Sequence, residues 1–156
     1  LCPGAEYGPA KRWPAAKFAA LAALAVAAGY CIRILGSPKD QEAADAIAAG
    51  AGVPVDNLVG RTTLVEAAAI LAGADVVISN DSGLMHVAGA FDRRLVVLYG
   101  ASSEKMTPPA SPFARVMARE LPCRPCHKRE CPLGPLACLE SIAPEEVLAA
   151  AEQMRR

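Results

Sequence analysis

The stretch Asp75-Val76-Val77-Ile78-Ser79-Asn80-Asp81-Ser82-Gly83-Leu84-Met85-His86 decides the fold of this chain. Its apolar residues predict a buried strand over 76–79, and the polar residues after them predict a turn that opens a helix over 83–90. The first N–H groups of a helix have no partner within the helix and lie at the positive end of its dipole, so a bound phosphate is stabilised there. Two interpretations of the turn stay open at this point: an anion-binding site, or an ordinary helix cap without a ligand.

Strands and helices alternate along the rest of the chain. Further strands are predicted at 31–35, 58–59, 95–99 and 114–118, and further helices at 14–29, 41–49, 63–72 and from 144 onward. The main strands read IRIL, VVIS and LVVLY, and such continuous apolar runs are typical of parallel strands buried on both faces. We therefore predict an α/β fold with a doubly wound, Rossmann-like parallel sheet, in a single domain over residues 1–156.

Charge and composition exclude several classes of protein. The sixteen Lys and Arg residues balance sixteen Asp and Glu residues, so no net field recruits nucleic acid or an anionic membrane. The longest apolar stretch, 18–28, is too short to span a bilayer, and no signal-peptide pattern is present. The chain opens on Leu1 and reads like the end of a strand. We therefore expect a cytoplasmic fragment of a longer protein.

The loops that follow the strands are the candidate sites, because doubly wound sheets bind ligands at the carboxyl ends of their strands. The first loop, PGAEYGPAKRWP over 3–14, holds Gly4, Gly8 and two cations. Lys11 can act as a point charge on a diphosphate, or it can be a solvated surface cation. Asp40 follows the strand predicted at 31–35, where it either accepts hydrogen bonds from a ribose or stabilises the start of the next helix. Thr62 or Thr63 can cap the third helix.

His86 lies one turn into the helix over 83–90 and can face the same ligand as the start of that helix. His127 is the only other histidine, which disfavours a His-based metal site, and the sequence lacks the Gly-x-Ser-x-Gly elbow of many hydrolases. It also lacks a Gly-x-Gly-x-x-Gly turn, which disfavours an NAD enzyme. We interpret His86 as a binding or electrostatic residue.

A Cys/Pro-rich loop over 121–139 is the second unusual feature. Its four cysteines could bind a zinc ion tetrahedrally, and they are Cys123, Cys126, Cys131 and Cys138. The first pair has the spacing of a zinc knuckle, whereas the second pair is too widely spaced for an ordinary zinc ribbon. Another thiolate-bound metal, an iron–sulfur cluster, reduced structural cysteines and disulfides are the alternatives. The sequence leaves these alternatives open.

Long stretches of the chain resemble the ADP-heptose:lipopolysaccharide heptosyltransferases of glycosyltransferase family 9. The resemblance rests on PGAEYGPAKRWP at 3–14, GRTTLVEAAAILAGADVVISNDSGLMHVAGA at 60–90, LYGASS at 98–103 and CRPCHKRECPLGPLACL at 123–139. The NDSG turn and the cysteine loop resemble the second type of heptosyltransferase more than the first. That family has two Rossmann-like domains facing across a cleft, the GT-B architecture. This chain is similar to the carboxyl-terminal, donor-binding domain.

The resemblance implies a role for each candidate residue. Lys11 should contact the donor diphosphate and stabilise the leaving group, and Thr62 should line the adenosine pocket. Asp40 matches the ribose-binding acid, with Glu42 as the alternative. The implied donor site comprises Gly4, Lys11, Asp40, Thr62, Asp81, Ser82, Gly83 and His86.

The resemblance also implies a reaction, the inverting transfer of L-glycero-D-manno-heptose from ADP-heptose to the lipopolysaccharide inner core. Such a transfer needs a base for the acceptor hydroxyl and positive groups for the leaving diphosphate. The base of the family is an Asp in the amino-terminal domain, which this chain does not contain. We expect the chain to bind the donor but to transfer little alone, to need no cofactor, and to meet the acceptor through that other domain. The full enzyme would be cytoplasmic or peripheral at the inner membrane.

A different class of function remains as the alternative. In it the chain is a non-catalytic binding module, whose four-cysteine loop is stabilised by a metal and presents an interaction surface. Metal analysis of the reduced protein separates this alternative from the transferase, because the binding module requires bound metal in each chain.

Overall fold

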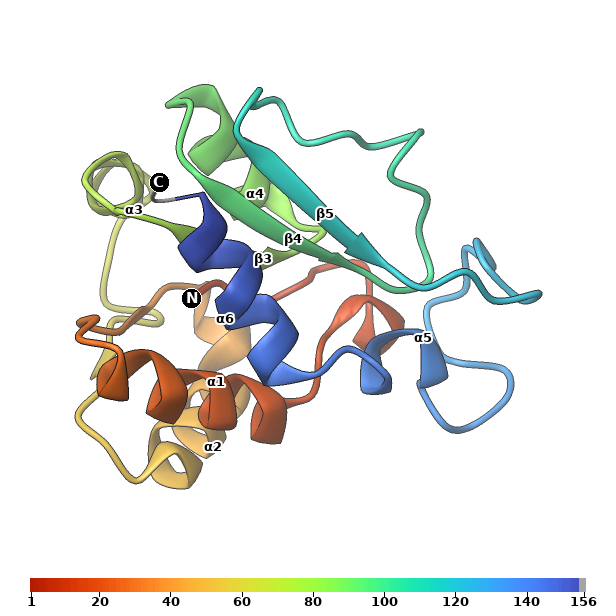
Figure 1. Ribbon diagram of the computed structural model, residues 1–156, viewed down its shortest axis with the longest axis horizontal. Coiled ribbons are helices and arrows are strands. Elements are labelled where there is room, and N and C mark those ends of the chain that lie inside the picture. The colour runs from red at the N-terminus through yellow and green to blue at the C-terminus, as the bar shows by residue number, and fades with distance from the viewer. Residues whose placement is uncertain (155–156) are drawn as a thin grey trace.

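The structure is a computed structural model that describes residues 1–154. Strands and helices alternate through most of the chain (Figure 1). The strands are β1 Arg33–Ile34, β2 Asp56–Asn57, β3 Val77–Asn80, β4 Leu95–Tyr99 and β5 Ala114–Ala118. The helices are α1 Ala15–Ala27, α2 Gln41–Ala51, α3 Leu64–Ala72, α4 Gly83–Ala90, α5 Ala137–Glu140 and α6 Pro144–Gln153, with short 3-10 turns η1 Pro9–Lys11 and η2 Pro38–Asp40.

All strand pairings in the described part of the chain are parallel, as predicted. β1 pairs with β2, and β4 lies between β3 and β5. The first two residues of the chain join these two groups of strands. The Leu35 N–H donates to the Leu1 carbonyl, while the Cys2 N–H donates to the carbonyl of Ile78. The strands therefore form one doubly wound arrangement in which residues 1–2 occupy the place between β1 and β3.

Alternate residues of β4 point to two different cores, which explains its unbroken apolar sequence. Val96 and Leu98 pack in a core with α1, α2 and α6. Leu95, Val97 and Tyr99 pack in the other core, with α3 and α4. Because successive side chains of a strand alternate between its faces, this division shows that helices cover both faces of the sheet.

The structure corrects some predicted boundaries. The strand predicted at 58–59 is in fact Asp56–Asn57. Residues 56–57 align with β1, and the chain then turns at Gly60, which has φ +68°. The first strand is limited to Arg33–Ile34. Residues 137–140, which were predicted to be loop, form α5, and Leu139 packs in the core. Within residues 1–154, no helix combines the length and apolarity needed to cross a membrane.

Candidate functional site

A cleft of about 500 Å³ opens where β1 and β3 end. Its walls come from the first loop, η2, and the first turns of α3 and α4, so segments far apart in the sequence meet there. Most of the predicted donor-site residues line it together, namely Gly4, Asp40, Thr62, Ser82 and Gly83. The loops that follow β1 and β3 therefore meet the first loop at one edge of the sheet.

Asp40 and Gly4 are fitted to each other at the base of this cleft. Both the N–H and the hydroxyl of Ser37 donate to Oδ2 of Asp40, at 2.9 and 2.8 Å, so this carboxylate stabilises η2. A Cβ on Gly4 would lie 2.5 Å from the same oxygen, so only glycine fits there. Asp40 therefore stabilises the start of the helical segment after β1, which was one of its two predicted roles. A contact with ribose stays a prediction. Glu42 is exposed on α2 and does not line the cleft.

The start of α4 is open toward a ligand. Ser82 occupies the N-cap position, and within the described residues its side chain makes no capping hydrogen bond. Its hydroxyl lies 3.3 Å from the Ser79 hydroxyl instead. A Cβ on Gly83 would meet no atom within 4 Å. Among the described residues, the Ser82 side chain thus leaves the first N–H groups of α4 uncapped, which is the arrangement that an anion can use.

Lys11 and Asp81 form a buried ion pair directly before this helix. The Lys11 Nζ lies 2.6 Å from Oδ2 of Asp81, and the two side chains are only 14% and 4% exposed. The Ser102 hydroxyl donates to the same oxygen at 2.6 Å, and the Thr107 hydroxyl lies 3.4 Å from it. Lys11 is therefore not a solvated surface cation. The Asp81 carboxylate holds the Lys11 ammonium at the carboxyl end of β3, next to Ser82.

Ser102 and Thr107 are site residues that sequence reasoning missed, and Tyr99 supports them. The Tyr99 hydroxyl donates to the Thr107 carbonyl. Burial, and then the negative charge of Asp81, raise the pKa of Tyr99 well above its ordinary value, so the hydroxyl stays protonated as a donor. The only signal in the sequence for Ser102 and Thr107 as site residues was their place in the Ser/Thr/Pro-rich stretch that follows β4.

Asn80 is a further residue that the sequence analysis did not single out. It is fully buried, its side-chain oxygen accepts from the Trp13 N–H at 3.0 Å, and its amide donates to the Pro3 carbonyl at 2.6 Å. Both ends of the first loop are thereby fastened to β3. A polar side chain at the end of the buried strand VISN was the available signal, because buried amides need partners. Arg12 closes the same loop by donating to the Ala5 carbonyl.

The structure does not place His86 with the other site residues. This side chain is exposed on α4 and does not line the cleft. Its binding or electrostatic role stays a prediction.

The Cys/Pro-rich loop brings its four cysteines around one small cavity of about 30 Å³. Cys123 is exposed, whereas Cys138 is buried, and burial raises the pKa of its thiol. No group of three or more His, Cys, Asp or Glu side chains in residues 1–154 is arranged to hold a metal ion. The structure thus lends no support to the metal-stabilised binding module.

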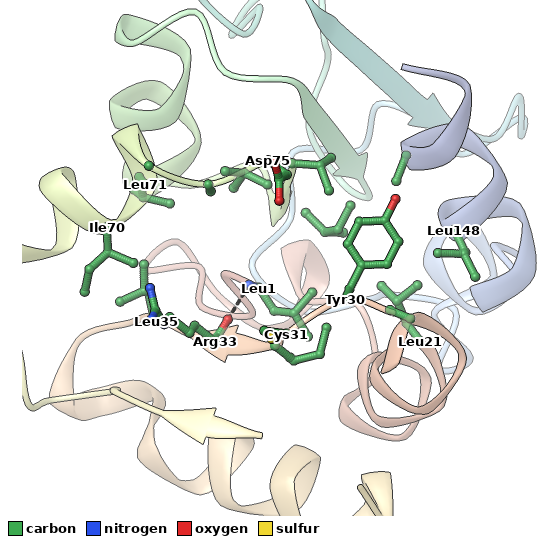
Figure 2. Close-up of a pocket in the computed structure, with 18 of the residues that line it drawn as sticks. Leu1, Leu21, Tyr30, Cys31, Arg33, Leu35, Ile70, Leu71, Asp75 and Leu148 are labelled. Atoms are coloured by element: carbon green, nitrogen blue, oxygen red, sulfur yellow. Dashed lines mark hydrogen bonds between the residues drawn. The ribbon is translucent and has the colours of Figure 1, made fainter. Parts of the chain in front are cut away.

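A second hollow, of about 350 Å³, lies at the amino ends of β1 and β3 (Figure 2). Aliphatic side chains from the strands, α1, α3 and α6 surround it, among them Leu21, Leu71 and Leu148. The amino group of Leu1 donates to the Arg33 carbonyl at its edge. It lies at the opposite end of the strands from the loops that carry the predicted site.

Comparisons with known proteins agree with the geometry. The profile of glycosyltransferase family 9 (heptosyltransferase) matches residues 1–137. Lipopolysaccharide heptosyltransferase 2 of Salmonella typhimurium is 43% identical over 152 residues, which are 95% of this chain and 44% of that protein. The solved structure of the ADP-heptose lipopolysaccharide heptosyltransferase II of E. coli matches 99% of this chain and 45% of its own, with 39% identity and a TM-score of 0.86.

A second solved structure, the family 9 glycosyltransferase of Veillonella parvula, matches 97% of the chain at 30% identity with a TM-score of 0.82. The chain thus spans less than half the length of these relatives. The agreement in sequence and in fold extends over nearly all of the chain and includes every loop of the cleft. The chain belongs to glycosyltransferase family 9, the heptosyltransferase family.

Proposed function

We propose that this chain is the donor-binding half of an inverting heptosyltransferase and that it binds ADP-heptose in the cleft. The observation that carries the proposal is the buried Lys11–Asp81 pair beside the uncapped start of α4. An ammonium held in place and the first N–H groups of a helix, which have no partner within the helix, together form a binding site for a diphosphate. The names of the similar proteins, which are lipopolysaccharide heptosyltransferases, support this choice of donor.

Each part of the site, which comprises the cleft and the adjoining Lys11–Asp81 pair, has a proposed role. Lys11 and the first N–H groups of α4, with Ser82 and Gly83, bind the diphosphate. Thr62 and the wall near Gly4 and Asp40 take the nucleoside. The sugar then extends toward the exposed side of α4, where His86 lies.

The proposed chemistry is stabilisation of a leaving group. When the bond between the heptose and the diphosphate breaks, negative charge grows on the phosphate oxygen. Lys11 and the dipole of α4 stabilise that charge without rearrangement, because Asp81, Ser102 and Asn80 already fix their positions. The acceptor hydroxyl loses its proton to a base, which we assign to the amino-terminal half of the full-length enzyme.

This assignment makes the remaining partners part of the proposal. The chain acts together with an amino-terminal domain that binds the lipopolysaccharide inner core, in the cytoplasm or at the inner membrane. In isolation it binds the donor and transfers little heptose. The roles assigned to Lys11 and to the helix dipole require no cofactor.

Calorimetry with ADP and ADP-heptose tests the proposal on the isolated chain. We expect binding, and we expect ligand at about 100 times its Kd to stabilise the fold by about 2.7 kcal/mol. Lys11→Ala should abolish binding, whereas Lys128→Ala, which removes an exposed cation of the Cys/Pro-rich loop, should not. No binding of either ligand at millimolar concentration contradicts the proposal.

A further inference from the structure

Residues 124–129 of the Cys/Pro-rich loop lie against both of the loops that carry the charged site. We call this segment the brace. The sequence analysis considered this loop only for its cysteines, and the proposed function assigns it no role. Its contacts nevertheless converge on Lys11 and Ser102.

The brace holds the loop of Lys11 through backbone and side-chain contacts. The Ala10 N–H donates to the Arg129 carbonyl at 3.0 Å, and the Arg129 Nε donates to the Tyr7 carbonyl at 2.8 Å. The Tyr7 hydroxyl donates to the His127 carbonyl at 2.7 Å. The approach at Gly8 is so close that a Cβ there would lie 2.6 Å from the Arg129 carbonyl oxygen. Residues before η1 (Tyr7 and Gly8) and within it (Ala10) are thus held by the brace.

The brace also holds the loop of Ser102. The guanidinium of Arg124 donates to the Gly100 carbonyl at 2.6 Å and to the Ser102 carbonyl at 3.0 Å. The His127 N–H donates to the Ala101 carbonyl at 2.9 Å. The Arg124 side chain is only 8% exposed and pairs with Glu104 at 3.1 Å. A planar guanidinium can satisfy several carbonyls of one turn at once, which lysine cannot do.

The two braced loops meet at a single atom. Lys11 comes from one loop, Ser102 comes from the other, and both donate to Oδ2 of Asp81. Displacement of either loop would therefore move the ammonium relative to the start of α4. We infer that Arg124 and Arg129 are positioning residues of the diphosphate site, which act through Lys11 and Ser102 without touching the ligand. This inference rests on the proposed function.

The test compares two neighbouring cations of the brace. Arg129→Met removes the hydrogen bond to the loop of Lys11, and Lys128→Met is the matched control, because it removes an equal charge from an exposed neighbour. By calorimetry, Arg129→Met should raise the Kd for ADP about tenfold, which corresponds to one misplaced charged hydrogen bond. The Kd for adenosine should stay within about twofold, because the nucleoside does not depend on Lys11. Equal losses for both ligands, or no loss for ADP, overturn the inference.

Arg124→Met should also raise the Kd for ADP and leave the Kd for adenosine nearly unchanged. Its effect on the Kd for ADP should be larger than that of Arg129→Met, since it releases both the Gly100 and the Ser102 carbonyls. If that variant fails to fold, Arg129→Met decides, because residue 129 is exposed.

Hydrogen exchange separates this inference from the proposed function, because it needs no ligand. The buried Ala10 amide, bonded to the brace, should exchange faster in Arg129→Met than in Lys128→Met. If the wild-type chain binds no ADP, the proposed function fails. The positioning role then stands on faster exchange at Ala10 and falls if the exchange is unchanged.

Discussion

The two hollows lie at opposite ends of the sheet and are lined by different groups. The cleft at the carboxyl ends has about 500 Å³, and glycines, hydroxyl groups and the Asp40 carboxylate line it together with apolar side chains such as Leu64 and Val87. The hollow at the amino ends has about 350 Å³ and is lined mainly by aliphatic side chains (Figure 2). Volume therefore does not identify the site in this fold.

What distinguishes the cleft is the direction of the backbone around it. β1 and β3 end there, α3 and α4 begin there, and the Lys11–Asp81 pair lies beside it. Helix starts present N–H groups, whereas the amino ends of the strands provide no comparable array of donors. The topology, together with a few small residues, therefore makes the polar site.

The largest effect is expected from breaking the buried ion pair. Lys11→Met leaves the Asp81 carboxylate buried without its cation, so we expect the free energy of unfolding to fall by about 3 kcal/mol. Urea denaturation measures it. Adding Asp81→Asn to this variant should restore part of the loss, because no uncompensated charge remains. A double variant less stable than Lys11→Met would show that Asp81 is not paired chiefly with Lys11.

A smaller effect is expected at the start of α4. Gly83→Ala adds a Cβ that meets no protein atom within 4 Å, so stability should be retained or rise slightly. If the diphosphate lies against these N–H groups, the added methyl group should weaken ADP binding about tenfold, since it crowds one close contact. Calorimetry measures the affinity and thermal unfolding provides the control. Unchanged ADP affinity would place the ligand elsewhere.

A substitution in the hollow at the amino ends of the strands should instead lower stability without weakening ADP binding. Leu148→Ala removes aliphatic surface from its wall, and we expect a loss of about 1–2 kcal/mol of stability. The Kd for ADP should remain within about twofold, because the hollow lies at the other end of the strands. The same denaturation and calorimetry experiments apply. A selective loss of ADP affinity would reverse the assignment of the two hollows.

The smallest effect concerns the two helix starts that form the cleft. The start of α3, unlike that of α4, is capped: the Thr63 hydroxyl accepts from the Glu66 N–H, and the Glu66 carboxylate accepts from the Thr63 N–H. These bonds, chiefly the one from the Thr63 backbone, lower the pKa of Glu66. A lowered pKa means that this stabilisation is present above the ordinary value near 4.3 and is lost as the pH falls through the lowered pKa.

The stability difference between the wild type and Glu66→Gln should therefore be present at pH 7 and vanish in acid. Thermal unfolding over that pH range measures it. A difference that stays constant as the pH falls would show that the capping box of α3 is not formed. In that case the contrast between a capped α3 and an open α4 would lose its basis.

Local sequence patterns predicted the central elements well. The helix over 83–90 and the strands over 95–99 and 114–118 have the predicted boundaries, because each is bounded by turn residues or contains an unbroken apolar run. The prediction placed the strand at 56–57 two residues too late, at 58–59. Asp56 and Asn57 have low strand propensity and pair there only because β1 aligns them.

The candidate site was predictable only where one loop carries its own signal. The glycines and the cation of the first loop, and the turn at Asp81, could be recognised in isolation. The roles of Ser102, Arg124 and Asn80 depend on loops that meet only after folding, and no local pattern encodes such a meeting. The exposed position of His86, away from the cleft, likewise depends on how α4 rotates against β3.

A structure of the chain with ADP-heptose bound would test the central claim most directly. We predict that the diphosphate lies within hydrogen-bond distance of the Lys11 Nζ and of the first N–H groups of α4, with the nucleoside in the cleft beside Thr62. A donor bound in the apolar hollow at the amino ends of β1 and β3, or bound without contact to Lys11, would contradict it.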